Sequence, residues 1–168
     1  MLLDINTLTA TLGAMSAQLN NSAGCLTPEN HAKALREVLS PAAEIHLPGS
    51  AEFDAASTRW SVLEVPTVNI AVVPATEDDV VETVKYANEV ESPILAFNGA
   101  HGAITTLGRM DRGIEIYLSR LSSVEVDQEH RSATIGGGAS TKAVIDALWE
   151  VGRQAGKLSA ILPLITWC

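Results

Sequence analysis

The sequence has few basic residues, few aromatic residues and only two cysteines. Its 168 residues include 11 lysines and arginines against 20 aspartates and glutamates, which gives a net charge of −9 at pH 7. So acidic a chain lacks the basic face that nucleic-acid binding requires, and an anionic membrane surface repels it. We therefore expect a small-molecule substrate and neither nucleic acid nor membrane as a partner; the sequence indicates no oligomeric state.

The two cysteines, Cys25 and Cys168, lie far apart and have no metal-ligand spacing around them. This excludes the pattern of a disulfide scaffold and predicts no metal site. The N-terminus lacks the basic start of a secretory signal, and its apolar residues are spaced rather than continuous, so neither a signal peptide nor a membrane span is visible. A cytoplasmic location is the default expectation.

What is present is a globular composition, with 46% hydrophobic residues and 18% charged residues. Apolar spacing predicts one helix over residues 4–20, and a second that begins at Thr27 with Pro28 in its first position. A short strand is expected at 45–47, whereas residues 48–60 are ambiguous.

The clearest pattern begins at residue 68. A buried strand, Val68–Val73, precedes a helix opened by Thr76 and Asp79 as a capping box. The expected inward face of that helix is formed by Val80, Val81, Val84, Ala87 and Val90. A strand at 94–97 follows, so this strand, helix and strand predict a parallel unit.

A third strand is expected at 114–118. Residues 124–127 and 133–135 then predict a hairpin. A last helix is capped by Ser140, with an inward face that comprises Val144, Ile145, Leu148 and Trp149. The fold class is thus α+β (α/β), with N-terminal helices, a small parallel sheet with flanking helices, and the beginning of a second sheet. We expect His31, His46 and His130 to be surface or capping residues, and Trp60 and Trp149 to be packed.

Two glycine-containing loops are candidates for ligand binding. The first follows the 94–97 strand and reads Phe97, Asn98, Gly99, Ala100, His101, Gly102. Small residues after a parallel strand let the backbone approach a ligand, and successive N–H groups can bind an anion such as a phosphate. The alternative is a tight loop with a surface histidine, because isolated glycine loops are weak signals.

The second loop is Gly136, Gly137, Gly138, Ala139 and Ser140 at a helix start. Helix N-termini attract anions, but this is neither a dinucleotide fingerprint nor a P-loop. The alternative interpretation is a strand-to-helix turn that needs glycine for positive φ.

The order of these pieces resembles a known family. The run RWSVLEVPTVNIAVVPATEDDVVETVKYANEVESPILAFNGAHGAITTLG, followed by GIEIYLSRLSSVEVDQEHRSATIGGGASTKAVIDAL, resembles the N-terminal FAD-binding part of oxidases with a vanillyl-alcohol-oxidase (PCMH-type) flavin domain. It is most similar to the berberine-bridge-enzyme-like branch of fungal and plant secondary metabolism. No single piece is specific, but the ordered set over about ninety residues is.

The resemblance implies an FAD-dependent oxidoreductase in which a substrate hydride goes to flavin N5 and dioxygen is the acceptor. Residues 98–102 would surround the FAD pyrophosphate, and His101 falls where the family often bonds flavin covalently. Gly136, Gly137, Gly138 and Ser140 would contact the cofactor from the second subdomain. The family loop usually reads Arg-x-Gly-Gly-His-Ser, so Phe97 replaces a cation, Ala100 a glycine and Gly102 a serine. No catalytic base is identified.

Length is the other departure, since family members run to several hundred residues. We expect an N-terminal helical segment (1–59), a partial PCMH-type FAD-binding domain (60–158) and an apolar tail (159–168) to which the sequence assigns no role. Residues 155–168 resemble a premature end rather than the family's continuation. One alternative function is a truncated, non-catalytic remnant with weak or no flavin binding. Another is a module that binds a different phosphate ligand through the same loops.

Overall fold

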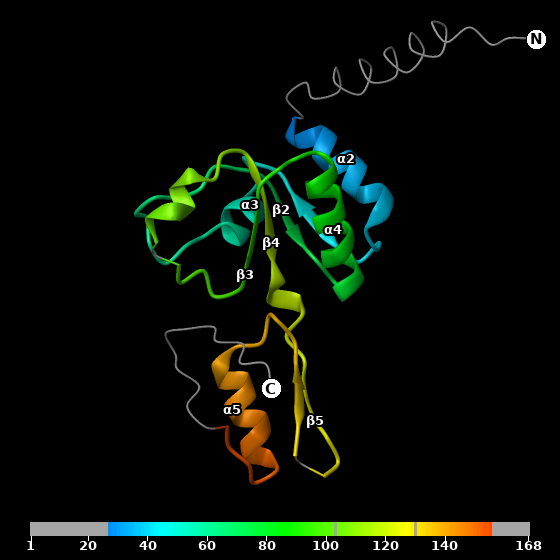
Figure 1. Cartoon of the computed structure of the whole chain (residues 1–168), viewed down its shortest axis with the longest axis vertical. Helices are drawn as coiled ribbons and strands as arrows, with labels where there is room; N and C mark the ends of the chain where they lie inside the picture. Colours follow the sequence, from blue (N-terminus) through cyan, green and yellow to red (C-terminus); the bar gives the residue numbers. More distant parts are fainter. Residues whose placement is uncertain (1–26, 103, 130, 156–168) are drawn as a thin grey trace, which may run out of the picture.

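A computed structural model describes residues 27–102, 104–129 and 131–155. They form an upper lobe with a four-stranded sheet and a smaller lobe below it (Figure 1). The upper lobe contains α2 (Pro28–Val38), β1 (Glu44–His46), α3 (Ala51–Ala56), β2 (Val68–Val73), α4 (Glu77–Glu89), β3 (Ile94–Phe97), η1 (Thr105–Arg109) and β4 (Gly113–Tyr117). After η2 (Leu118–Arg120), the smaller lobe contains β5 (Val124–Val126), β6 (Ala133–Ile135) and α5 (Thr141–Glu150). The predicted α+β class is confirmed, whereas the 4–20 helix lies outside the described residues.

The strand order of the main sheet is β1-β2-β4-β3. β4 pairs in parallel with both β2 and β3, and β1 adds an antiparallel edge to β2. The chain therefore crosses from β2 through α4 to β3 and leaves room for β4 between them. The prediction of a parallel strand–helix–strand unit holds, with this additional strand in the middle. Because β3 and β4 are parallel, their carboxyl ends lie at the same edge, toward the smaller lobe (Figure 1).

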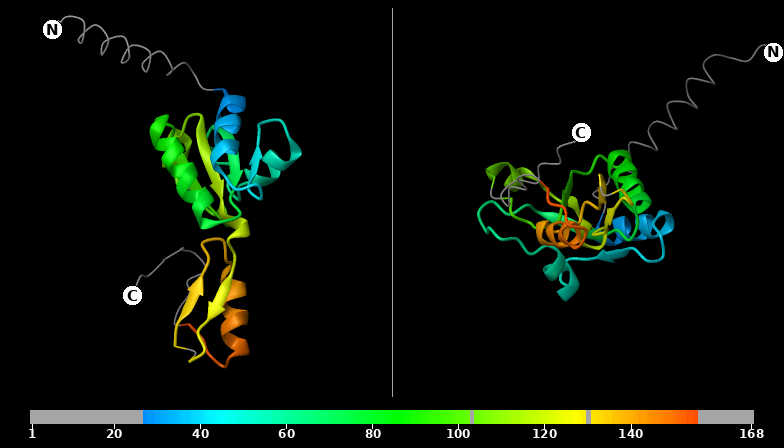
Figure 2. Two further views of the ribbon diagram at one scale, coloured as in Figure 1. Left: turned by 90° about the vertical axis from the view of Figure 1, so that its right-hand side faces the viewer. Right: turned by 90° about the horizontal axis from the view of Figure 1, so that it is seen from below.

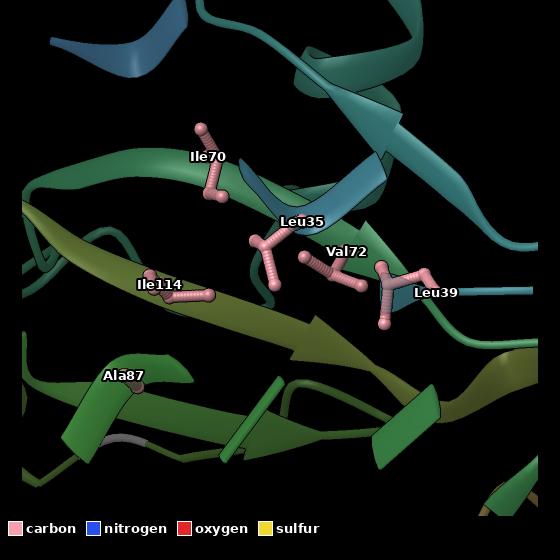
Figure 3. Packing of buried hydrophobic residues seen from close by; sticks show 6 residues of the cluster. All are labelled: Leu35, Leu39, Ile70, Val72, Ala87 and Ile114. Atoms are coloured by element: carbon pink, nitrogen blue, oxygen red, sulfur yellow. The ribbon is translucent and has the colours of Figure 1, made fainter. Parts of the chain in front are cut away.

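One face of the sheet carries the apolar core. α2 and α4 lie side by side against it, while α3 lies apart from them against β1 and β2 (Figures 1 and 2). The core cluster comprises Leu35, Leu39, Ile70, Val72, Ala87 and Ile114 (Figure 3). Since side chains alternate along a strand, Glu115 and Tyr117 of β4 belong to the opposite face. That second face is the one that concerns the site.

Helix starts follow the local chemistry of the sequence. Thr27 caps α2, which has Pro28 at its first position, and Ser140 caps α5. Thr76 and Asp79 form the predicted capping box of α4. Asp79 also accepts hydrogen bonds from the backbone N–H and the hydroxyl of Ser40, at 2.7 and 2.9 Å, and so ties the end of α2 to the start of α4. Burial alone would raise the pKa of Asp79, but the hydrogen bonds from Ser40 and Thr76 outweigh it and lower this pKa to about 2.

Several expectations about burial are wrong. His31 is buried rather than at the surface, and its Nδ1 lies 2.9 Å from the Tyr86 hydroxyl. Trp60 and Trp149 are 77% and 75% exposed instead of packed. Ile145 is also exposed, so only part of the predicted face of α5 is covered by the described residues. These positions depend on contacts between distant segments, which periodicity does not report.

Smaller differences concern α4, β1 and α3. Val81 is exposed, and the buried positions of α4 are Asp79, Thr83 and Ala87. β1 begins and ends one residue earlier than the expected 45–47 strand. The ambiguous stretch contains the short helix α3, for which Ser50 is the N-cap. Six residues are too few to show helical periodicity, so the cap was the only available signal.

Candidate functional site

The loop after β3 is an open backbone turn. The N–H groups of Gly99, Ala100, His101 and Gly102 donate no hydrogen bond to any other described residue. Ala100 has a φ of +50°, a left-handed conformation that is uncommon for a residue with a side chain. Successive N–H groups beside a left-handed residue form the concave turns that bind anions. Together with its position at the carboxyl end of a parallel strand, this makes the loop suited to a phosphate group.

Other side chains lie close against the two glycines of this loop. A Cβ at Gly99 would lie only 2.6 Å from Nε2 of His101, so the imidazole ring sits directly over Gly99. A Cβ at Gly102 would lie 3.1 Å from Cδ1 of Leu107 and 3.6 Å from Nη2 of Arg59. His101 itself is exposed, and the neighbouring residues are small. A ligand can therefore reach the imidazole without displacing a bulky side chain.

The loop Gly136–Gly138 is built differently. The N–H groups of Gly136 and Gly138 donate to the carbonyl oxygens of Ser123 and Leu121, at 2.8 and 2.9 Å. Neither glycine has a positive φ, so the interpretation that this turn needs glycine for positive φ is wrong. Instead, a Cβ at Gly138 would overlap the carbonyl oxygen of Leu118, and one at Gly136 would overlap that of Leu121. The glycines are needed because another segment passes very close.

Some N–H groups at the helix start beyond this loop also have acceptors within the protein. Ser140 Oγ accepts the N–H of Ala143 at 3.1 Å, and the Ser140 carbonyl accepts that of Val144. The Ala139 N–H donates to the carbonyl of Gly136. The N–H groups of Gly136, Gly138 and Ala139 are thus used within the protein. Those of Gly137 and Ser140 have no acceptor among the described residues and are the ones that a ligand could use.

Asn98 brings the two loops together. Its Nδ2 donates to the carbonyl oxygen of Gly138 at 2.8 Å and to that of Ala139 at 3.4 Å. This contact spans 40 residues of sequence and joins the end of β3 to the start of the α5 segment. The predicted site residues therefore do meet, although Asn98 acts by holding the second loop. Spacing alone did not indicate this role.

Phe97 stacks on Tyr117 rather than facing a ligand. Their rings are nearly parallel, 14° apart in plane, with centroids separated by 5.1 Å. The guanidinium carbon of Arg59 lies 5.4 Å from the Phe97 centroid on the same face of the sheet. The sequence prediction missed Arg59, because it lies outside any regular element and 38 positions before Phe97.

The described residues show neither a metal-binding cluster nor a membrane-spanning helix. No group of three or more His, Cys, Asp or Glu side chains in the described part of the chain could hold a metal ion. Within that same part, none of the helices combines the length and apolar character that a membrane span needs.

Comparison with known proteins identifies similar chains. Residues 68–164 match the FAD binding domain family, and the match includes part of the 155–168 stretch in which the resemblance was expected to have ended. The FAD-linked oxidoreductase chyH of Penicillium rubens is 59% identical over 122 residues, which are 73% of this chain and 24% of that protein. The chain thus spans about a quarter of the length of the curated relatives it matches.

Solved structures share the fold. The BBE-like 1 protein of Physcomitrella patens has a TM-score of 0.63 at 20% identity, over 72% of this chain and 26% of that one. Glucooligosaccharide oxidase from Acremonium strictum, described with 6-S-cysteinyl, 8α-N1-histidyl FAD, has a TM-score of 0.61 at 24% identity, over 70% of this chain and 25% of that one. The expected first subdomain of this flavin fold is therefore confirmed.

Proposed function

Since this chain belongs to the FAD binding domain family, we propose that it forms the pyrophosphate-binding part of an FAD-linked oxidoreductase of secondary metabolism. The observation that carries the proposal is the row of N–H groups from Gly99 to Gly102, which have no acceptor among the described residues. Bound FAD would supply hydride-transfer chemistry toward a small organic substrate, with dioxygen as the final electron acceptor.

The residues present fit the cofactor at the first loop. The N–H groups there would donate to the pyrophosphate oxygens, and Ala100 in its left-handed conformation turns them toward one side. The loop Gly136–Gly138 and Ser140 would line the site and support it through Asn98, and the N–H groups of Gly137 and Ser140, which have no acceptor among the described residues, could also donate to the ligand.

His101 would hold the flavin covalently. Its imidazole is exposed over Gly99, with no bulky neighbour within the loop. His101 would form a bond to the 8α-methyl carbon while it loses its N–H proton, and dioxygen would accept the two electrons and the two hydrogens released. The histidyl link described for the Acremonium strictum oxidase supports this choice.

The test is the visible absorption of the 168-residue chain after incubation with FAD and gel filtration. We expect flavin bands to elute with the protein and to remain in the pellet after acid precipitation. In His101→Ala the flavin should still elute with the protein but should appear in the acid supernatant. His46→Ala, which removes a histidine on β1, is the matched control and should behave as the unmodified chain.

Two results would count against parts of the proposal. Absence of flavin from the eluted protein at saturating FAD would overturn the cofactor assignment for this chain. Flavin that elutes with the protein but is released by acid from the unmodified chain would reject only the covalent role of His101.

A further inference from the structure

A buried ion pair lies on the sheet face opposite the apolar core. Glu115, on the central strand β4, is only 1% exposed, and its Oε1 lies 3.4 Å from Nη1 of Arg59. The Arg59 side chain is 6% exposed, although it comes from the irregular segment between α3 and β2. Buried ion pairs usually contribute little net stability, because removing two charges from water costs about as much as their attraction returns. Stability alone therefore does not account for this pair.

The pair leaves most of the guanidinium unbonded. Among the described residues, Arg59 has one hydrogen bond, from Nη1 to Glu115, out of the five N–H donors of an arginine. The Phe97 ring supports the guanidinium from one side, at 5.4 Å. Glu115 and Phe97 thus fix the position of a cation while they leave the rest of its N–H groups available.

The available part of Arg59 lies at the open loop. Its Nη2 is 3.6 Å from the position of a Cβ on Gly102, the last of the residues with unpaired N–H groups. The next residue, Trp60, donates its backbone N–H to the carbonyl of Ala100 at 3.3 Å. The segment that carries Arg59 is therefore attached directly to the loop. The guanidinium therefore lies next to the loop at Gly102.

We propose that Arg59 is the anion-binding side chain of this site: its guanidinium binds the diphosphate group at the loop Gly99–Gly102, and Glu115 and Phe97 position it. A guanidinium offers two parallel N–H donors that match the spacing of phosphate oxygens. The chain has a net charge of −9, so a diphosphate requires a local cation to offset the general repulsion. The identity of the ligand as FAD rests on the proposed function. The negative charge of the ligand is inferred from Arg59 and the loop N–H groups alone.

The state of Glu115 is consistent with this role. Burial raises the pKa of the Glu115 carboxyl, and the nearby Ser57 hydroxyl and the positive charge of Arg59 oppose that rise. Its second oxygen, Oε2, is buried without a hydrogen-bond partner among the described residues. Glu115 therefore engages a single N–H group of Arg59, through Oε1.

The test measures binding of three ligands by isothermal titration: FAD, inorganic pyrophosphate and riboflavin, which has no phosphate. We expect Arg59→Met to weaken FAD and pyrophosphate binding by about tenfold to hundredfold, the range for one lost charge-assisted hydrogen bond. It should leave riboflavin binding unchanged and reduce the salt dependence of FAD binding. The matched control is Arg36→Met on the exposed side of α2, which removes the same charge and should change none of the three.

Three further variants keep the test decisive if Arg59→Met does not fold. Arg59→Lys retains the charge but loses the paired donors, so FAD and pyrophosphate should bind more weakly while riboflavin is unaffected; unchanged binding of all three would overturn the proposal. Glu115→Gln keeps an acceptor for Nη1 and removes the opposing charge. Pyrophosphate should then bind as tightly or more tightly, whereas Glu115→Ala, which removes the acceptor for Nη1, should bind it more weakly. Unchanged pyrophosphate binding by Glu115→Ala would contradict the positioning role.

The outcomes separate this inference from the proposed function. If the unmodified chain binds FAD and Arg59→Met binds it equally well, the role of Arg59 is wrong and the cofactor assignment stands. If the chain binds pyrophosphate through Arg59 but does not bind FAD, the anion site stands and the cofactor assignment fails. Failure of the unmodified chain to bind either ligand overturns both.

Discussion

In the loop Gly99–Gly102 four successive N–H groups have no acceptor among the described residues, whereas in Gly136–Gly138 the first and last N–H groups are bonded to Ser123 and Leu121. The backbone N–H groups of the first loop are therefore unpaired within the described part of the protein. The second is compressed against the segment after β4, so that a methyl group at Gly138 would overlap the Leu118 carbonyl. In the first loop the glycines leave room for the side chains of His101 and Leu107, whereas in the second they leave room for the backbone carbonyls of Leu118 and Leu121.

A glycine-rich sequence therefore does not by itself distinguish a loop that binds a ligand from one that packs against another segment. What distinguishes them is the partner of each N–H group, which depends on segments far away in the sequence. Asn98 shows that the two loops still act together, because its amide holds the carbonyls of the second loop beside the first. Substitutions that affect the loops differently therefore test the comparison.

The largest effect is expected from Gly138→Ala. Because the added methyl group would overlap a backbone oxygen, which cannot rotate away, we expect the free energy of unfolding to fall by about 3 kcal/mol or more. The matched control is Gly137→Ala. Its methyl group would lie 3.4 Å from Cδ1 of Leu118, an ordinary contact, and should change stability by about 0.5 kcal/mol or less. Urea unfolding of both variants measures the difference; equal losses would show that the second loop is not compressed.

The features that the sequence predicted well are those with local causes. The starts of α2, α4 and α5 were located by Thr27, Thr76 and Ser140, since a capping side chain bonds to an N–H group three residues ahead. The β5–β6 hairpin was found for the same reason, because its two strands are close in sequence. These local signals, together with the apolar strand patterns from residue 68 onward, predicted the fold class and the loop at the end of β3.

The features that it did not predict depend on distant partners. Arg59 and Glu115 are 56 residues apart, and no periodicity relates them. The insertion of β4 between β2 and β3 was likewise not visible, because a continuous apolar run does not specify its neighbours. Phe97 was interpreted as the loss of a cation from the loop. The fold instead places another arginine against that ring, which only the packed sheet face reveals.

A smaller effect is expected from Asn98→Ala, which separates the two loops without adding any atom. The substitution removes the donor at 2.8 Å from the Gly138 carbonyl and leaves that buried residue's oxygen without this partner. We expect a loss of about 1–3 kcal/mol in unfolding free energy, the usual cost of an unsatisfied group, together with weaker FAD binding. Asn88→Ala, on the exposed side of α4, is the control and should have almost no effect on either quantity. A stable variant with unchanged FAD affinity would mean that the loops bind independently.

The smallest effect, and one of opposite sign, is expected from Ala100→Gly. A non-glycine residue at a φ of +50° costs about 1–2 kcal/mol, and glycine removes this cost. Glycine also has more conformational freedom in the unfolded chain, which lowers the free energy of unfolding by about 0.4–1 kcal/mol. We therefore expect a net increase in the free energy of unfolding of about 0.5 kcal/mol. The same change at Ala96, an exposed position of β3 with extended backbone, should instead destabilise by about 0.5–1 kcal/mol. Opposite signs in thermal unfolding would support the left-handed turn on which the open N–H groups depend. A loss at both positions would place Ala100 in an ordinary extended conformation, and the concave arrangement of donors in the first loop would then be wrong.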